Sequence, residues 1–151
     1  MSNHATAPLL QVQGLNAWYG AAQILFDVSL QVGRGEVVAL MGRNGAGKST
    51  TLKALMGMVT RRGSVQFLGQ DIARREPHEI ARLGLGYVPE ERRMGVLFTE
   101  HSMDVVFGQA DRVLVLVRGR LLAEGTPEQI QADARVQEAY LGAGFDAGEA
   151  A

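Results

Sequence analysis

Short apolar and alternating segments, separated by turns rich in glycine, make up most of the chain. Apolar and polar residues alternate over residues 9–15 and 23–32, which predicts two strands with a turn at residues 18–20 between them. The segment 36–41, which is apolar from Val37 to Met41, predicts a buried strand, and a helix is expected over residues 50–58. The first third of the chain therefore predicts antiparallel strands followed by a strand, a loop and a helix.

The rest of the chain predicts short strands and helices in mixed order. The expected strands are residues 63–68, 85–88, 96–99, 112–117 and 121–124. The expected helices are residues 77–83, with Pro77 in the first turn, and residues 102–110, 127–132 and 136–141. This order predicts an α/β fold, with antiparallel strands at the N-terminus and a partly parallel sheet. One domain is expected over residues 9–142, between a disordered N-terminus at residues 1–8 and a small, polar tail at residues 143–151.

Composition narrows the class of protein. A length of 151 residues fits one domain, and a hydrophobic content of 46% can build a core. The net charge of −1 argues against a nucleic-acid partner, because such proteins are usually basic. The chain has no cysteine, which excludes disulfides and thiolate metal sites and fits the cytoplasm. No apolar run approaches the roughly 20 residues of a membrane-spanning helix, and no signal peptide is expected.

Residues 42–49 carry the complete pattern GxxxxGKS between the expected strand and helix. Glycines let the backbone approach a phosphate closely, and a helix N-terminus offers free N–H groups and partial positive charge. A lysine can reach the terminal phosphates, and the following hydroxyl can bind Mg²⁺. A chance glycine-rich turn is the alternative, and the two flanking elements argue against it. The predicted site for ATP is Gly42, Arg43, Asn44, Gly45, Ala46, Gly47, Lys48, Ser49 and Thr50, with Ser49 as the ligand of Mg²⁺.

Several stretches together resemble the ATP-binding cassette (ABC) ATPases. The similarity covers nearly all of residues 9–142 and lies in residues 18–20, 25–30, 35–40 and the P-loop with residues 50–52. The chain is most similar to ATPase subunits of importers for branched-chain amino acids, or their urea and amide relatives, in residues 43–47, 86–90 and 124–127. The resemblance implies a P-loop NTPase core of ABC type that uses ATP and Mg²⁺.

The resemblance also implies roles for three side chains outside the loop. Tyr19 matches the aromatic residue that stacks on adenine, with ordinary packing as the alternative. Glu90 occupies the Q-loop position, where it either helps to place Mg²⁺ or water or is an exposed charge. His101 matches the switch histidine that contacts the terminal phosphate.

Several parts of the family pattern are not found in this sequence. These are the Walker B strand, with its aspartate and glutamate, the LSGGQ signature, the D-loop and the helical subdomain that would dock on a permease. Parallel neighbours need a crossover of about a dozen residues or more, yet only residues 89–95 separate the strands expected at 85–88 and 96–99. We therefore expect a truncated P-loop NTPase that is shortened near residues 91–95. A natural deletion, a fusion of two genes and an annotation artefact are open explanations.

The resemblance implies an ATP-binding importer subunit that works with a membrane permease and a second ATPase subunit. Its expected location is the cytoplasm, peripheral to the cytoplasmic face of the inner membrane. We expect the P-loop to bind ATP, but not hydrolysis by this chain alone, so whether the chain is an enzyme stays open. The alternative hypothesis is a non-hydrolysing nucleotide-binding remnant or a fusion fragment without transport function.

Overall fold

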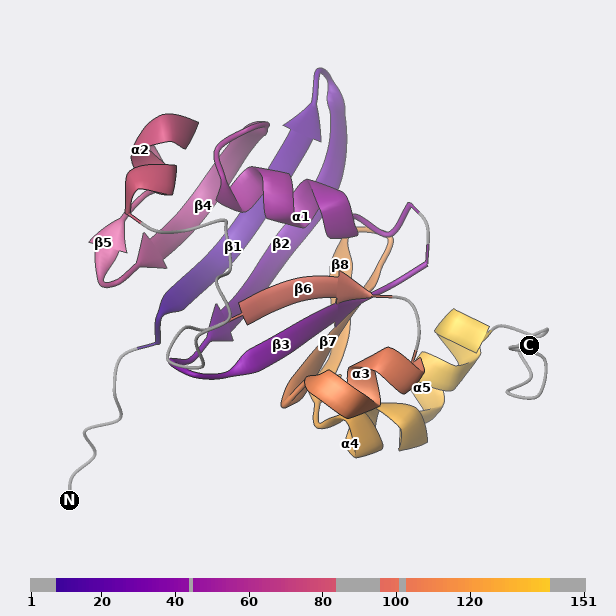
Figure 1. The fold of residues 1–151 in the computed structure, drawn as a ribbon. Coiled ribbons are helices and arrows are strands. Elements are labelled where there is room, and N and C mark those ends of the chain that lie inside the picture. Colours follow the sequence, from indigo (N-terminus) through magenta and orange to yellow (C-terminus); the bar gives the residue numbers. More distant parts are fainter. Residues whose placement is uncertain (1–7, 44, 84–95, 101–102, 142–151) are drawn as a thin grey trace.

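The computed structural model describes residues 8–43, 45–83, 96–100 and 103–141, which form two sheets and several short helices (Figure 1). One sheet is antiparallel and has the order β2-β1-β4-β5. Its strands are β1 (Leu10–Tyr19), β2 (Ala22–Val32), β4 (Thr60–Phe67) and β5 (Gln70–Asp71). The predicted antiparallel strands at the N-terminus are therefore confirmed.

The second sheet has the order β6-β3-β7-β8 and is mixed. Its strands are β3 (Val37–Met41), β6 (Val96–Glu100), β7 (Arg112–Val117) and β8 (Arg120–Gly125). β6 and β7 both run parallel to β3, and β8 pairs with β7 as an antiparallel hairpin. The structure thus confirms the α/β class and the partly parallel sheet.

The helices lie on both sides of the mixed sheet. α1 (Lys48–Leu55) lies between the two sheets, and α2 (Pro77–Arg82) follows β5. On the other face of the mixed sheet, Figure 1 shows α3 (Met103–Gln109), α4 (Pro127–Ala132) and α5 (Ala134–Val136) gathered together; η1 (Gln137–Leu141), a π-helical turn, continues from α5. Pro77 lies in the first turn of α2, as predicted.

The continuous apolar run of β3 follows from burial on both faces. Val38 and Leu40 belong to the core that α1 shares with the antiparallel sheet. Ala39 and Met41 belong to a second core, which lies under α3, α4 and α5. Successive side chains of a strand point to opposite faces, so a strand covered on both sides has no polar positions.

Several predicted boundaries were wrong. Trp18 and Tyr19 lie within β1 rather than in a turn, because the ladder with β2 continues through both residues up to Ala22. The helix expected over residues 50–58 begins at Lys48 and ends at Leu55, before Gly57 at φ +79°. The strand expected from residue 63 begins at residue 60, since it pairs with β1 as far as Trp18. Gln70–Asp71, expected as a turn, forms β5, and the last predicted helix is divided into α5 and η1.

Some predictions fall outside the described residues. These are the N-terminal segment up to residue 7, Asn44, the strand at 85–88, Glu90, the shortening near 91–95, His101 and the tail. In the part of the chain that the structure does describe, no helix is both long enough and apolar enough to cross a membrane.

Candidate functional site

The P-loop connects the end of β3 to the start of α1, as its sequence predicts. Gly45 and Gly47 have positive φ angles of +87° and +106°, which glycine adopts without steric cost. Gly47 is also packed tightly, because a Cβ atom there would lie 2.8 Å from Cδ2 of Leu25 in β2. Nothing lies within 4 Å of a Cβ built on Gly45. Gly47 is therefore required by conformation and by space, and Gly45 by conformation alone.

The N-terminus of α1 is open to an anion. Its N-cap is Gly47, no side chain caps the helix, and no acidic residue lies in the first turn. The first N–H groups of a helix have no acceptor within the helix, and they carry partial positive charge. The ladder begins with the N–H of Thr51, which donates to the carbonyl of Gly47 at 2.8 Å. This arrangement suits a phosphate group.

The side chains at this helix start differ in their exposure. The Lys48 ammonium donates a hydrogen bond to the carbonyl of Gly42. This bond places the positive charge of Lys48 at the start of the loop. Ser49 is exposed, so its hydroxyl is available to a metal ion. Thr50 is only 5% exposed, which leaves its backbone N–H as the group it can offer. The Ser49 hydroxyl oxygen fits Mg²⁺, whose shell phosphate oxygens would complete, and the Lys48 ammonium and the N–H of Thr50 fit a phosphate chain.

The turn between β7 and β8 contacts the P-loop, and the sequence analysis did not identify this contact. The N–H of Gly119 donates to the carbonyl of Ala46 at 2.8 Å, and the carbonyl of Gly119 accepts from the N–H of Phe26 at 2.9 Å. Gly119 has φ +82°, and a Cβ atom there would lie 2.0 Å from the carbonyl oxygen of Ile24. One residue thus joins the P-loop to β2. A glycine between two arginines that link two strands was the available signal.

Tyr19 lies at the end of β1 beside the helix that the P-loop opens. Its side chain is 43% exposed, and the Lys53 ammonium lies 5.9 Å from the ring centroid. Lys53 is five positions after Lys48 in α1, roughly 7–8 Å along the helix axis at 1.5 Å per residue. The ring is therefore exposed and close to α1. Whether it stacks on a base stays a prediction.

A charged cluster anchors the other end of β3. Arg112 donates to Glu36 at 2.9 and 3.0 Å and also contacts Glu124 and the carbonyl of Gln31. The hydrogen bond from Arg112 holds the pKa of Glu36 below its ordinary value, and the same bond raises the pKa of Arg112. This cluster ties the start of β3 to β2, β7 and β8.

The structure brings only part of the predicted site together. It places the P-loop residues other than Asn44 around the start of α1, with Tyr19 beside that helix. β6 ends with Glu100 opposite Met41, so this strand stops level with the start of the loop. Asn44, Glu90 and His101 lie outside the described residues, and their roles stay predictions.

The sequence matches a known family along most of its length. The sequence model of that family, described as "ABC transporter", matches residues 25–146. The chain belongs to the ABC transporter family. The fold of the chain agrees with this family. The solved structure of an ATP-binding cassette of an ABC transporter in its ADP conformation superposes on it with a TM-score of 0.79. The two sequences are 17% identical, and the superposition covers 91% of this chain and 100% of that chain.

Individual ABC relatives differ in how much of the chain they match. The lipopolysaccharide export system ATP-binding protein LptB of Acidithiobacillus ferridurans is 48% identical over 84 residues, which is 55% of this chain and 35% of that protein. The probable branched-chain amino acid transport ATP-binding protein LivF of Archaeoglobus fulgidus is 39% identical over 122 residues, 80% of this chain and 52% of that protein. The chain thus spans about half the length of such relatives, or less.

Proposed function

We propose that this chain is the ATP-binding part of an ABC importer subunit and that it holds Mg-ATP on its P-loop. The observation that carries the proposal is the uncapped start of α1, which follows two glycines at positive φ and bears Lys48 and an exposed Ser49. Phosphates would accept hydrogen bonds from the loop and helix N–H groups, and Lys48 would leave the carbonyl of Gly42 for a phosphate oxygen.

Branched-chain amino acids are the solute class that we propose for this importer. The relatives with this printed function match 72% and 80% of the chain, those of Pseudomonas aeruginosa and Archaeoglobus fulgidus respectively. By contrast, the export protein LptB of Acidithiobacillus ferridurans matches 55% and the ribose import protein RbsA of Pseudomonas putida matches 62%. The proposed partners are a membrane permease, which would hold the chain at the cytoplasmic face of the membrane, and a second ATPase subunit.

Nucleotide binding is tested by titrating the full chain with Mg-ATP in a calorimeter. We expect Lys48→Ala to weaken binding by roughly tenfold to a hundredfold, because hydrogen bonds to a charged group contribute about 1.5–3 kcal/mol. Arg82→Ala is the control, since Arg82 lies in the last turn of α2, outside the P-loop and α1. Equal affinity of the wild type and Lys48→Ala would contradict the proposal.

Hydrolysis is tested separately. The carboxylates of the Walker B strand were not found in the sequence, so we propose binding without turnover by the isolated chain. Phosphate release by the wild type should equal that of Lys48→Ala. A rate clearly above that of the variant would show that another group activates water.

A further inference from the structure

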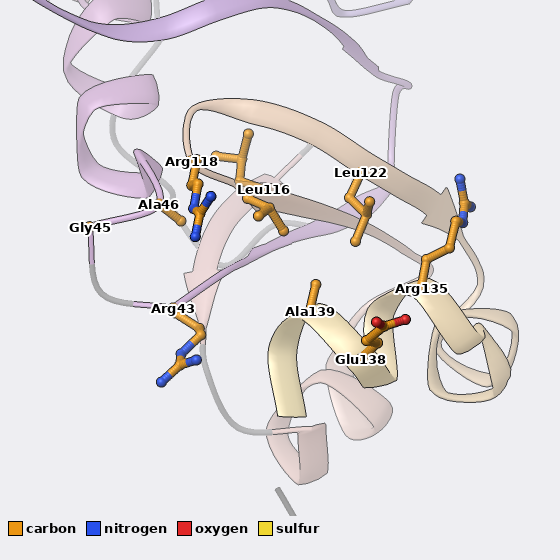
Figure 2. Close-up of a pocket in the computed structure, with 10 residues that line it drawn as sticks. Arg43, Gly45, Ala46, Leu116, Arg118, Leu122, Arg135, Glu138 and Ala139 are labelled. Carbon is orange, nitrogen blue, oxygen red and sulfur yellow. The ribbon is translucent and has the colours of Figure 1, made fainter. Parts of the chain in front are cut away.

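An open pocket of about 780 Å³ lies beside the P-loop, between the loop, the turn that joins β7 to β8, and the segment of α5 and η1. Arg43, Gly45 and Ala46 of the loop line one side of it, and Arg118 of the turn lies beside them (Figure 2). The pocket therefore shares residues with the phosphate site and brings Arg118 to the border of that site.

The turn fixes the position of Arg118 relative to the loop. The N–H of Gly119 donates to the carbonyl of Ala46 at 2.8 Å. Arg118 directly precedes Gly119, so its carbonyl carbon is bonded to the nitrogen that makes this hydrogen bond and lies within about 4 Å of the Ala46 oxygen. Exposed charges interact over a Debye length of about 10 Å at 0.1 M salt. The charge of Arg118 is therefore close enough to act on a phosphate that is bound to the loop.

The positive charge on this side of the pocket is available to a ligand. Arg118 and Arg43 are both exposed, and the part of the chain that the structure describes gives neither a hydrogen-bond nor an ion-pair partner. Arg135, which also borders the pocket, is instead engaged with Asp133 at 2.8 Å. Glu138 is the acid among the described lining residues, and Figure 2 shows it in η1, away from the loop.

A nucleotide on the P-loop would lie in the positive field of these arginines. The energy of an ion in a fixed field is proportional to its charge, and Mg-ATP carries one more negative charge than Mg-ADP. We propose that Arg118 is a further specificity-determining residue of the nucleotide site, whose charge strengthens the binding of Mg-ATP more than that of Mg-ADP. This inference rests on the proposed binding of Mg-ATP to the P-loop.

The test is calorimetric titration of the full chain with Mg-ATP and with Mg-ADP at low salt. Arg118→Asn removes the charge, and asparagine tolerates the left-handed backbone of this position, φ +50°. We expect this variant to bind Mg-ATP roughly twofold to fivefold more weakly than the wild type, the scale of one exposed charge pair. The loss should be smaller for Mg-ADP, and it should shrink at high salt because ions screen exposed charges.

Two further variants separate the charge of Arg118 from other effects. Arg118→Lys keeps the charge and should restore most of the affinity for Mg-ATP that Arg118→Asn loses. Arg120→Asn is the matched control from the same hairpin, because the Arg120 guanidinium lies 4.8 Å from the ring centroid of Phe26 and Arg120 is not among the residues that line the pocket. Its loss of affinity should be smaller than that of Arg118→Asn.

The outcomes distinguish this inference from the proposed function. The inference alone is overturned if Arg118→Asn binds Mg-ATP as tightly as the wild type, if Arg120→Asn loses as much, if both nucleotides lose equally, or if Arg118→Lys restores nothing. If the wild type does not bind Mg-ATP, or if Lys48→Ala binds it equally well, the proposed function fails and the inference fails with it.

Discussion

Replacing Gly119 by alanine tests whether the turn between β7 and β8 holds the P-loop in place. A Cβ atom at this position would lie 2.0 Å from the carbonyl oxygen of Ile24 and 3.0 Å from the ring of Phe26. The obstacle at 2.0 Å is backbone, so it cannot move aside as a flexible side chain would. The turn must therefore shift, and the hydrogen bond to Ala46 and the one from Phe26 are weakened or lost.

The expected cost follows from these contacts. An alanine in the left-handed region costs about 1–2 kcal/mol. Two backbone hydrogen bonds contribute about 0.5–1.5 kcal/mol each, or about 1–3 kcal/mol together. We therefore expect Gly119→Ala to lower the free energy of unfolding by about 2–5 kcal/mol, which is large for a domain of this size.

Gly69→Ala is the matched control for this experiment. Gly69 has φ +80°, almost equal to the +82° of Gly119, but nothing lies within 4 Å of its Cβ position. Gly69→Ala should lower the free energy of unfolding only by the backbone term, about 1–2 kcal/mol. Both variants restrict the unfolded chain equally, so this effect cancels in the comparison. Urea unfolding followed by circular dichroism measures both, and equal losses would refute a supporting role for the turn.

Two further predictions concern the stability of the fold. Arg61 donates hydrogen bonds to the carbonyls of Ala54, Ile72, Ala73 and Arg75. Arg61→Ala removes these charge-assisted bonds and should lower the free energy of unfolding by about 2–4 kcal/mol, measured in urea. Arg62→Ala, which loses a cation–π contact with Trp18, should cost less than about 1 kcal/mol, and equal costs would contradict this. Because the folded pKa of Glu36 lies below its ordinary 4.5, its contribution is complete above that pH and is lost as the pH falls through the lower folded value. As the pH is lowered, the free energy of unfolding should therefore fall less for Glu36→Gln than for the wild type. The same pH dependence in both proteins would contradict the bond to Arg112.

Local sequence was enough to predict the P-loop and the elements that flank it. Its glycines, Lys48 and Ser49 are fixed by short-range geometry: a turn with positive φ angles and the start of a helix. The apolar run of β3 likewise reports burial on both faces. The parallel pairing of β3 with β6 and β7 was only partly predicted, because strand order depends on contacts between distant segments.

The supporting contacts of the site could not be predicted for the same reason. The bond between Arg112 and Glu36 joins residues 76 positions apart, and no local pattern indicates it. The acceptors of Arg61 are all backbone carbonyls, which every sequence contains. The turn predicted at Trp18 and Tyr19 was wrong because pairing with β2 overrides the local preference near Gly20.

β6 is where the sequence pattern and the environment differ most. The run from Val96 to Phe98 is typical of a parallel strand buried on both faces, yet all these side chains are only half-buried. Leu97 packs toward the core that contains α1, Phe98 packs toward the other core, and among the described residues β6 pairs with β3 alone. β3 itself has a parallel neighbour on each side. β3, the strand that leads into the P-loop, is thus an interior strand that is hydrogen-bonded on both sides. The start of the P-loop is therefore held by two neighbouring strands, although β6 is itself only half-buried.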